Sequence, residues 1–173
     1  MSSKRTVAID VETTGLSPAR GDRVIEVAAV KMANGCFDAV FNKLININAP
    51  IPRGAQKIHG ITNDMLVKAL QPDKVWLEFL DFIGESILIG HNVLFDMKFI
   101  RFELQLLDMS LSNSYQCTLD MSRKVLPNLK SYKLENVSKH VLGTIPPEIR
   151  LHRALGDAML AGLVWSTLIE KNQ

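Results

Sequence analysis

The chain of 173 residues lacks the features that would mark a membrane or secreted protein. No apolar run approaches the roughly 20 residues that a membrane-spanning helix needs. The opening stretch, "MSSKRTVAID", leads directly into an apolar segment and has no cleavage-site pattern behind it. We therefore expect a protein with no signal peptide and no contact with a membrane.

Cysteine is scarce, which excludes a disulfide-stabilised scaffold. Cys36 and Cys117 are the only two, and their spacing fits neither a metal-binding motif nor a disulfide framework. The expectation is a reduced, cytoplasmic protein.

A strong excess of one charge is also missing. Twenty Lys and Arg stand against 18 Asp and Glu, which gives a formal net charge of +2. So small an excess does not by itself indicate nucleic-acid binding. If several acids gather around metal ions, however, the remaining surface is more basic than the total suggests, and a polyanionic partner becomes compatible with the composition.

The composition that remains is that of an ordinary globular domain. Hydrophobic residues make up 47% and charged residues 22%, and the length suits one domain with a sizeable core. We predict a single domain over residues 1–173, with its core from about 5 to 170.

Strand patterns occupy the first third of the chain, and helices alternate with strands in the rest. Strands are predicted over 4–10, 22–32, 36–46, 86–90 and 114–118, with Asn34-Gly35 as a hairpin turn and a loop over 48–55. Helices are predicted over 62–70, 73–84, 93–109, 119–126, 131–143 and about 153–171, with Thr62 and Ser131 as N-caps and Gly143 as a C-terminal end. This order predicts an α/β layer with a mixed sheet.

Two carboxylates end the first predicted strand. Asp10 and Glu12 are separated by Val11, so in a strand both side chains point to the same face. Like charges this close repel each other, and burying them is costly unless a cation lies between them. The pair is either solvated at the strand end or held together by a metal ion.

Two further segments carry acids or a histidine at positions that side-chain packing does not explain. Asp96 lies in the opening turns of a helix, and His152 precedes the last helix, which carries Asp157 in its first two turns. Each has an ordinary explanation: an acid that complements a helix dipole, a surface histidine, an exposed helical position. Gly156, however, costs the helix about 1 kcal/mol relative to alanine unless another group must approach closely there.

Taken together, these residues form a set with a known chemistry. Four carboxylates can hold two hard divalent cations, which prefer oxygen ligands. Two such ions stabilise the attacking and leaving oxygens of a displacement at phosphorus, and a histidine can accept a proton from the attacking water. The set predicts cleavage of phosphodiester bonds, with the metal ions supplying the positive charge between Asp10 and Glu12.

Three motifs, "DVETTG", "HNVLFD" and "HRALGD", resemble in this order the three motifs of the DEDDh-type 3′–5′ exonucleases. The likeness is greatest to the proofreading epsilon subunit of bacterial DNA polymerase III and its related exonuclease domains. "IHGIT" and the "TLDMSRKVLP" helix agree as well, so the resemblance runs from about residue 6 to 169.

The resemblance implies a ribonuclease-H-like α/β fold and a site with two divalent metal ions, Mg²⁺ or Mn²⁺. Asp10 would bridge both ions, Glu12 and Asp157 would complete the site of the attacking water, and Asp96 would support the second ion through water. His152 would be the general base.

The family also implies where the 3′-terminal nucleotide binds. The backbone around Thr13 would hold the 3′-hydroxyl, and Leu16 would be an apolar wedge against the terminal base. His59, Asn92 and Phe95 would line the substrate pocket, although an aromatic residue at Phe95 fits a core position equally well.

The expected substrate is a single-stranded or frayed DNA 3′ end, from which nucleoside monophosphates are released in proofreading or repair. An RNA-trimming enzyme of the same family and a non-catalytic nucleic-acid-binding module are the alternatives. All four acids and the histidine are present, which argues against the second. The chain ends at "LIEKNQ" without the C-terminal segment that tethers the epsilon subunit to its polymerase, so polymerase association stays open.

Two other features bear on nucleic-acid binding. A basic group could follow a phosphate backbone or simply form solvated helix faces: Arg123, Lys124, Lys130, Lys133 and Lys139. The tryptophans, Trp76 and Trp165, occupy core-like helical positions and do not indicate a long stacking platform.

Overall fold

The computed structural model describes residues 5–33 and 35–171. Its centre is a five-stranded sheet in the order β3-β2-β1-β4-β5. The strands are β1 (Thr6–Thr13), β2 (Val24–Ala33), β3 (Cys36–Leu44), β4 (Ile87–Gly90) and β5 (Tyr115–Cys117). The pairs β1–β2 and β2–β3 are antiparallel, whereas β1–β4 and β4–β5 are parallel, so the predicted mixed sheet is confirmed.

Seven α-helices and one short 3₁₀ helix, η1 (Pro18–Arg20), are found in this part of the chain. The α-helices are α1 (Arg53–His59), α2 (Asn63–Val67), α3 (Pro72–Ile83), α4 (Leu94–Gln105), α5 (Thr118–Val125), α6 (Leu134–Leu142) and α7 (Ala154–Lys171). None of these helices has both the length and the apolar character to cross a lipid bilayer.

Most predicted elements are confirmed, with small changes at their ends. Thr62 occupies the N-cap position of α2, where its side chain makes no capping hydrogen bond, and Gly143, at φ 81°, ends α6. The hairpin between β2 and β3 is present, but Asn34, half of its predicted turn, lies outside the described residues. Cys36 and Cys117 are free thiols, as expected.

Two local predictions are wrong. The predicted loop over 48–55 contains the start of α1, because Pro52 lies at the N-cap, where a missing N–H costs the helix nothing. Ser131 does not cap α6, which begins at Leu134 after Lys133; the Ser131 hydroxyl instead accepts a hydrogen bond from Asn136 Nδ2 (2.8 Å).

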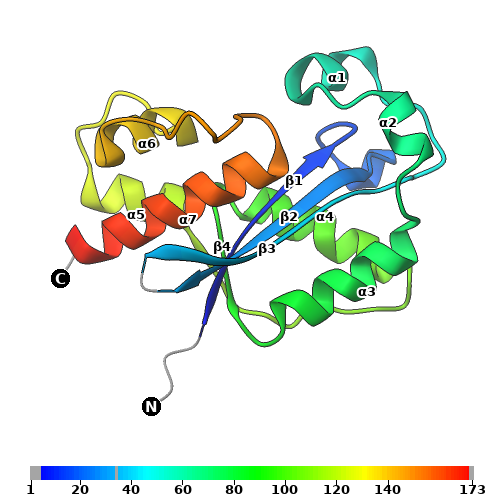
Figure 1. The fold of residues 1–173 in the computed structure, drawn as a ribbon, viewed down its shortest axis with the longest axis horizontal. Helices are drawn as coiled ribbons and strands as arrows, with labels where there is room; N and C mark the ends of the chain where they lie inside the picture. The colour runs from blue at the N-terminus through cyan, green and yellow to red at the C-terminus, as the bar shows by residue number, and fades with distance from the viewer. Residues whose placement is uncertain (1–4, 34, 172–173) are drawn as a thin grey trace.

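The helices cover the two faces of the sheet differently. In Figure 1, α7 lies beside α5 and α6, while α3 and α4 are grouped on the other side of the strands. Alternate residues of β1 divide between these faces: Val7, Ile9 and Val11 join the large core under α3 and α4, and Ala8 joins the small cluster under α7. Asp10 and Glu12 continue the Ala8 series and therefore face α7.

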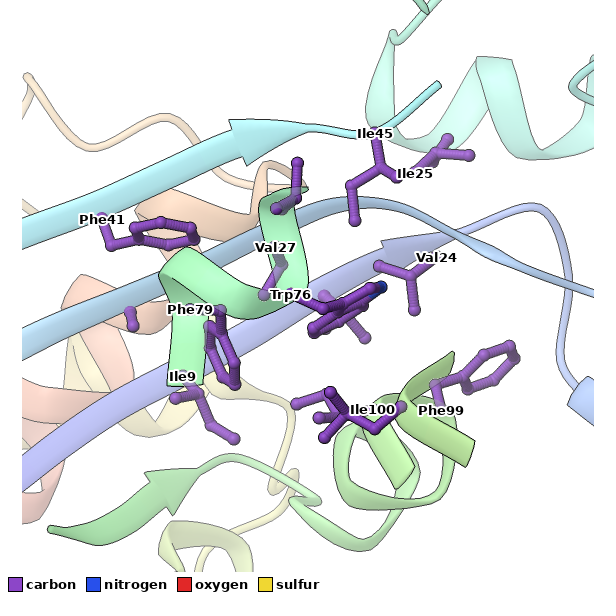
Figure 2. Packing of buried hydrophobic residues seen from close by; sticks show 14 of the residues in the cluster. Ile9, Val24, Ile25, Val27, Phe41, Ile45, Trp76, Phe79, Phe99 and Ile100 are labelled. Carbon is purple, nitrogen blue, oxygen red and sulfur yellow. The ribbon is translucent and has the colours of Figure 1, made fainter. Parts of the chain in front are cut away.

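The large core is built from aromatic and branched side chains. Figure 2 shows Trp76 and Phe79 of α3 among strand residues that include Ile9 and Val27, with Ile100 of α4 nearby. Trp76 is fully buried, as predicted.

Trp165, also predicted at a core-like position, packs against the small cluster under α7. It is only partly buried on α7 and lines a surface pocket of about 390 Å³ beside Tyr115 and Met121.

Candidate active site

The site lies at the end of β1, in the part of the strand that extends beyond its parallel neighbour β4. β1 pairs with β4 only from Thr6 to Ala8, but it pairs with β2 along its whole length. Beyond Ala8, one edge of β1 is therefore free of the sheet. Asp10 and Glu12 stand on this projecting part of the strand.

Three carboxylates meet on the α7 side. Asp10, Glu12 and Asp157 each offer one ligand oxygen, and these oxygens lie within 4.8 Å of one another. Asp157 reaches the strand from the first turn of α7. The structure thus brings together three of the four acids predicted for metal binding, although the sequence separates Asp157 from the other two by more than 140 residues.

Asp96 approaches from the other side of the sheet edge. It is buried in the first turn of α4, and its Oδ1 accepts a hydrogen bond from the Val11 N–H at 3.1 Å. The carboxylate thus takes the place of a backbone acceptor beyond the last β1–β4 pair. Asp96 is not in the three-acid group, but its hydrogen bond to Val11, the residue after Asp10, places it beside that group, and its charge raises the pKa of Asp10.

Burial and mutual repulsion make the ionised forms of these acids costly. Burial is the main cause that raises the pKa of Glu12 to about 8 and of Asp96 to about 8, and the charge of Asp157 adds to both. Burial and the charges of Asp96, Asp157 and Glu12 hold the pKa of Asp10 well above its ordinary value. Burial is also the main cause that raises the pKa of Asp157. Among the described residues, none forms a salt bridge with these four acids.

This donor set fits hard divalent cations. It offers carboxylate oxygens and neither thiolate nor imidazole in the three-acid group, and oxygen ligands suit Mg²⁺ and Mn²⁺. A divalent cation would also supply the positive charge that the cluster lacks.

His152 lies two residues before the start of α7, and its side chain is exposed. Its backbone has φ 57°, an uncommon value for a residue with a side chain, and its main chain hydrogen-bonds the Asp157 carboxyl. That bond and the charge of His152 lower the pKa of Asp157, against the larger effect of burial. The predicted base and the last acid are therefore neighbours in space.

Gly156 explains how this turn closes. A Cβ at this position would lie 1.9 Å from the Arg150 carbonyl oxygen, so no side chain fits. The predicted close approach at Gly156 is confirmed, and the group that approaches is the backbone of the loop before α7.

Glu26 is a fifth acid at the site that we did not predict. It lies opposite Glu12 in the β1–β2 register and is 1% exposed. Its carboxylate accepts hydrogen bonds from Arg153 Nε (2.9 Å) and Nη2 (2.5 Å) and from the Ala154 N–H (3.1 Å). The available signal was a single charged residue within the apolar run of residues 24–30.

The end of β1 and the loop after it carry two residues that are predicted to contact the terminal nucleotide, Thr13 and Leu16. Thr13 Oγ1 donates to the Gly15 carbonyl (2.6 Å), and Asp22 accepts a hydrogen bond from the Ser17 N–H (2.9 Å). Leu16 projects from this hydrogen-bonded loop with 82% of its surface exposed. An apolar side chain presented in this way suits a wedge, and that role stays a prediction.

The three pocket residues from the other motifs differ in their surroundings. His59 is buried; its Nδ1 accepts the Ile61 N–H (3.0 Å), and within the described chain its Nε2 has no hydrogen-bond partner. Asn92 is exposed at φ 62°. Phe95 packs on the large core with its ring 4.9 Å from that of Phe99, which favours the core interpretation.

The predicted basic group is exposed on α5, α6 and the segment between them. Arg123 forms an ion pair with Asp120, and Lys139 forms one with Glu135. These pairs are typical of solvated helix faces, so the two interpretations of the group stay open.

Comparison with known proteins assigns the family. The family model described as Exonuclease matches residues 7–164. The chain belongs to this family. The DEDDh-type resemblance found in its motifs is confirmed, and the chain is a 3′–5′ exonuclease, a hydrolase of phosphodiester bonds.

Individual relatives agree with this assignment. The DNA polymerase III subunit epsilon of Aquifex aeolicus (strain VF5) is 36% identical over 166 residues, which is 95% of this chain and 80% of the relative. The 3′-5′ exonuclease DinG of Bacillus subtilis (strain 168) is 35% identical over 173 residues, 99% of this chain but only 18% of the relative. The chain thus corresponds to most of one relative and to a small part of the other.

A solved structure confirms the fold. Exonuclease X in complex with 5′ overhanging duplex DNA superposes with a TM-score of 0.77 at 23% identity, covering 95% of this chain and 91% of that chain. The ribonuclease-H-like α/β layer expected from the motifs is therefore the fold observed.

Proposed function

We propose that the chain hydrolyses the last phosphodiester bond at the 3′ ends of single-stranded or frayed DNA and releases nucleoside monophosphates. The observation that carries this proposal is the convergence of Asp10, Glu12 and Asp157, whose ligand oxygens lie within 4.8 Å of one another.

Asp10, Glu12 and Asp157 would hold the divalent ions, with Asp96 supporting them from α4. Bound Mg²⁺ or Mn²⁺ would stabilise charge on the phosphoryl oxygens and lower the pKa of a bound water. The protein contributes the rigid backbone positions of β1 and α7, and the Val11 N–H holds the Asp96 carboxylate in place.

His152 would act as the general base. A neutral imidazole accepts a proton at its free ring nitrogen near neutral pH. As the water oxygen bonds to phosphorus, its proton passes to this nitrogen. The bond to the 3′-oxygen of the preceding nucleotide breaks, and that oxygen takes a proton from solvent. The exposed position of His152 beside Asp157 supports this role.

The loop after β1 would select the strand end. The exposed Leu16 offers an apolar surface to the terminal base, and the backbone near Thr13 offers polar groups to the 3′-hydroxyl. His59 and Asn92 would complete the pocket, together with Phe95, which packs on the core but is only partly buried.

A biological setting follows from the relatives. The 36% identity to a DNA polymerase III epsilon subunit, which covers 80% of that relative, supports a role in DNA proofreading or repair and a polymerase as the partner. The free cysteines and a DNA substrate support a cytoplasmic location.

The test uses end-labelled DNA and RNA of matched sequence with Mg²⁺ or Mn²⁺. We expect a ladder that shortens from the 3′ end of DNA and is abolished by EDTA or by Asp10→Asn. Asp81→Asn, an exposed acid on α3, is the matched control and should leave the ladder intact. Faster shortening of RNA would contradict DNA as the substrate, and no cleavage of either polymer would contradict the proposed function.

A further inference from the structure

Two buried glutamates bind arginine in the same way at different places in the fold. We call Glu26, Arg153 and the Ala154 amide the Glu26 clamp, and Glu103, Arg23 and the Val24 amide the Glu103 clamp. In the Glu103 clamp, Arg23 Nε and Nη2 each donate to the carboxylate at 2.8 Å, and the Val24 N–H donates at 3.0 Å. In both clamps the glutamate also accepts the N–H of the residue that follows the arginine.

The two clamps join different parts of the molecule. The Glu103 clamp ties α4 to the start of β2. The Glu26 clamp ties β2 to Ala154, the first residue of α7, whose N–H is one of the amides a helix leaves unpaired at its start. Asp157 follows within the same turn, and His152 precedes the clamp by one residue.

The Glu26 clamp also interacts electrostatically with the acids of the site. Glu26 faces Glu12 in the strand register, and its charge contributes to the raised pKa values of Asp10, Glu12 and Asp157. The guanidinium of Arg153 acts on Glu12 in the opposite direction and lowers its pKa. Glu103 is not among the causes of a shift in any of these groups.

From this geometry we infer that Glu26 and Arg153 are positioning residues for the reaction. They fix the start of α7 so that Asp157 meets Asp10 and Glu12, and the Glu26 carboxylate keeps the Arg153 guanidinium from pairing with Glu12. This inference rests on the proposed function, because it assigns the clamp a part in metal binding and in turnover.

The Glu103 clamp provides a matched control, because its glutamate is equally buried and its hydrogen bonds are the same in kind. The experiment compares Glu26→Gln with Glu103→Gln in the full chain by calorimetric titration with Mn²⁺, by kcat and KM on single-stranded DNA, and by thermal unfolding. Both variants should unfold at lower temperature than the wild type.

We expect only Glu26→Gln to weaken Mn²⁺ binding and to lower kcat, each by about 10- to 100-fold, the range seen when partners that orient metal ligands are removed. Its KM should change by less than its kcat. Glu103→Gln should keep its Mn²⁺ affinity within about twofold of the wild type. Equal weakening of Mn²⁺ binding in both variants would overturn the inference.

A second pair of variants covers the case in which a glutamine variant does not fold. Arg153→Lys and Arg23→Lys keep the charge but lose the planar two-point contact with the carboxylate. Arg153→Lys should lower kcat and Mn²⁺ affinity, whereas Arg23→Lys should leave Mn²⁺ affinity unchanged. Wild-type values for both in Arg153→Lys would overturn the inference.

The readouts separate this inference from the function on which it rests. A wild-type chain that binds Mn²⁺ but does not shorten DNA would refute the proposed function, and the Mn²⁺ comparison between the two clamps would still decide the positioning role. A wild-type chain that shortens DNA, with equal Mn²⁺ loss in both clamp variants, would refute the positioning role alone.

Discussion

β1 presents large apolar residues to the face of the sheet under α3 and α4, whereas it presents small or acidic residues to the face under α7. β1 contributes Val7, Ile9 and Val11 to the first face and Ala8, Asp10 and Glu12 to the second. The first face gains stability by burying apolar area. The second brings together groups that repel each other, which costs stability unless a cation binds between them. The odd-numbered residues of β1 therefore stabilise the fold, whereas its even-numbered residues supply the acids of the site.

Trp76→Ala should have the largest effect on stability, because it removes a fully buried side chain from the first face. Loss of a buried tryptophan costs about 3–5 kcal/mol of unfolding free energy. Urea denaturation should show this loss, while kcat/KM at low temperature, where the variant is folded, should stay close to the wild-type value. A large loss of activity in folded Trp76→Ala would contradict the separation of the two faces.

Asp157→Asn, on the second face, should have the opposite effect to Trp76→Ala: activity should be lost while stability is kept. We expect kcat/KM to fall by at least about 100-fold, since a ligand should matter more than the partners that orient it. Without divalent ions, its unfolding temperature should equal or exceed that of the wild type, because one repelling charge is gone. An unfolding temperature well below the wild-type value would show that the acid has a stabilising role.

Gly156→Ala tests the contact between α7 and the loop that precedes it. The new methyl group would collide with the Arg150 carbonyl, and overpacking of this kind costs about 1–3 kcal/mol. Because Asp157 is the next residue, activity should fall as well. Gly54→Ala on α1 is the control, since nothing lies within 4 Å of its added Cβ. Equal stability of the two alanine variants in urea would contradict the close approach.

Leu16→Ala should have the smallest effect on stability, below about 0.5 kcal/mol, because the side chain is 82% exposed. If Leu16 contacts the terminal base, KM for single-stranded DNA should rise several-fold with little change in unfolding temperature. Steady-state kinetics on a short oligonucleotide would measure this, and an unchanged KM would remove Leu16 from the pocket.

The sequence predicted those parts of the molecule that depend on local pattern. Strand patterns predicted β1 to β3, helical spacing predicted α3 with Trp76 inside, and three short motifs indicated the four acids and His152. The bounds of the domain, 1–173 with a core from about 5 to 170, stay a prediction.

What the sequence did not predict depends on contacts between distant residues. Arg153 and Glu26 are 127 positions apart, and Arg23 and Glu103 are 80 apart, so neither clamp has a local signature. The hydrogen bond between Val11 and Asp96 likewise exists only because β4 ends before β1 does.

Because the acids repel each other, the stability of the fold should depend on pH, and the direction of this dependence follows from the raised pKa values. Glu12 has a pKa of about 8 in the fold against an ordinary 4.5, and Asp96 about 8 against 3.8. Between about pH 4 and pH 8 the folded state therefore holds protons that the unfolded state has lost. Unfolding releases these protons, so in the absence of divalent ions stability should fall as the pH rises through this window.

The most direct test of the account is thermal unfolding of the wild type and Asp10→Asn at pH 8, with EDTA and then with Mn²⁺. We predict that with EDTA the variant is at least as stable as the wild type, because it lacks one of the crowded charges. With Mn²⁺ at about 100 times its dissociation constant, the wild type should gain about 2.7 kcal/mol and the variant much less, so that their order reverses. A wild type that is more stable than Asp10→Asn in EDTA and does not respond to Mn²⁺ would contradict the account, because the acids would then stabilise the fold and hold no metal ion.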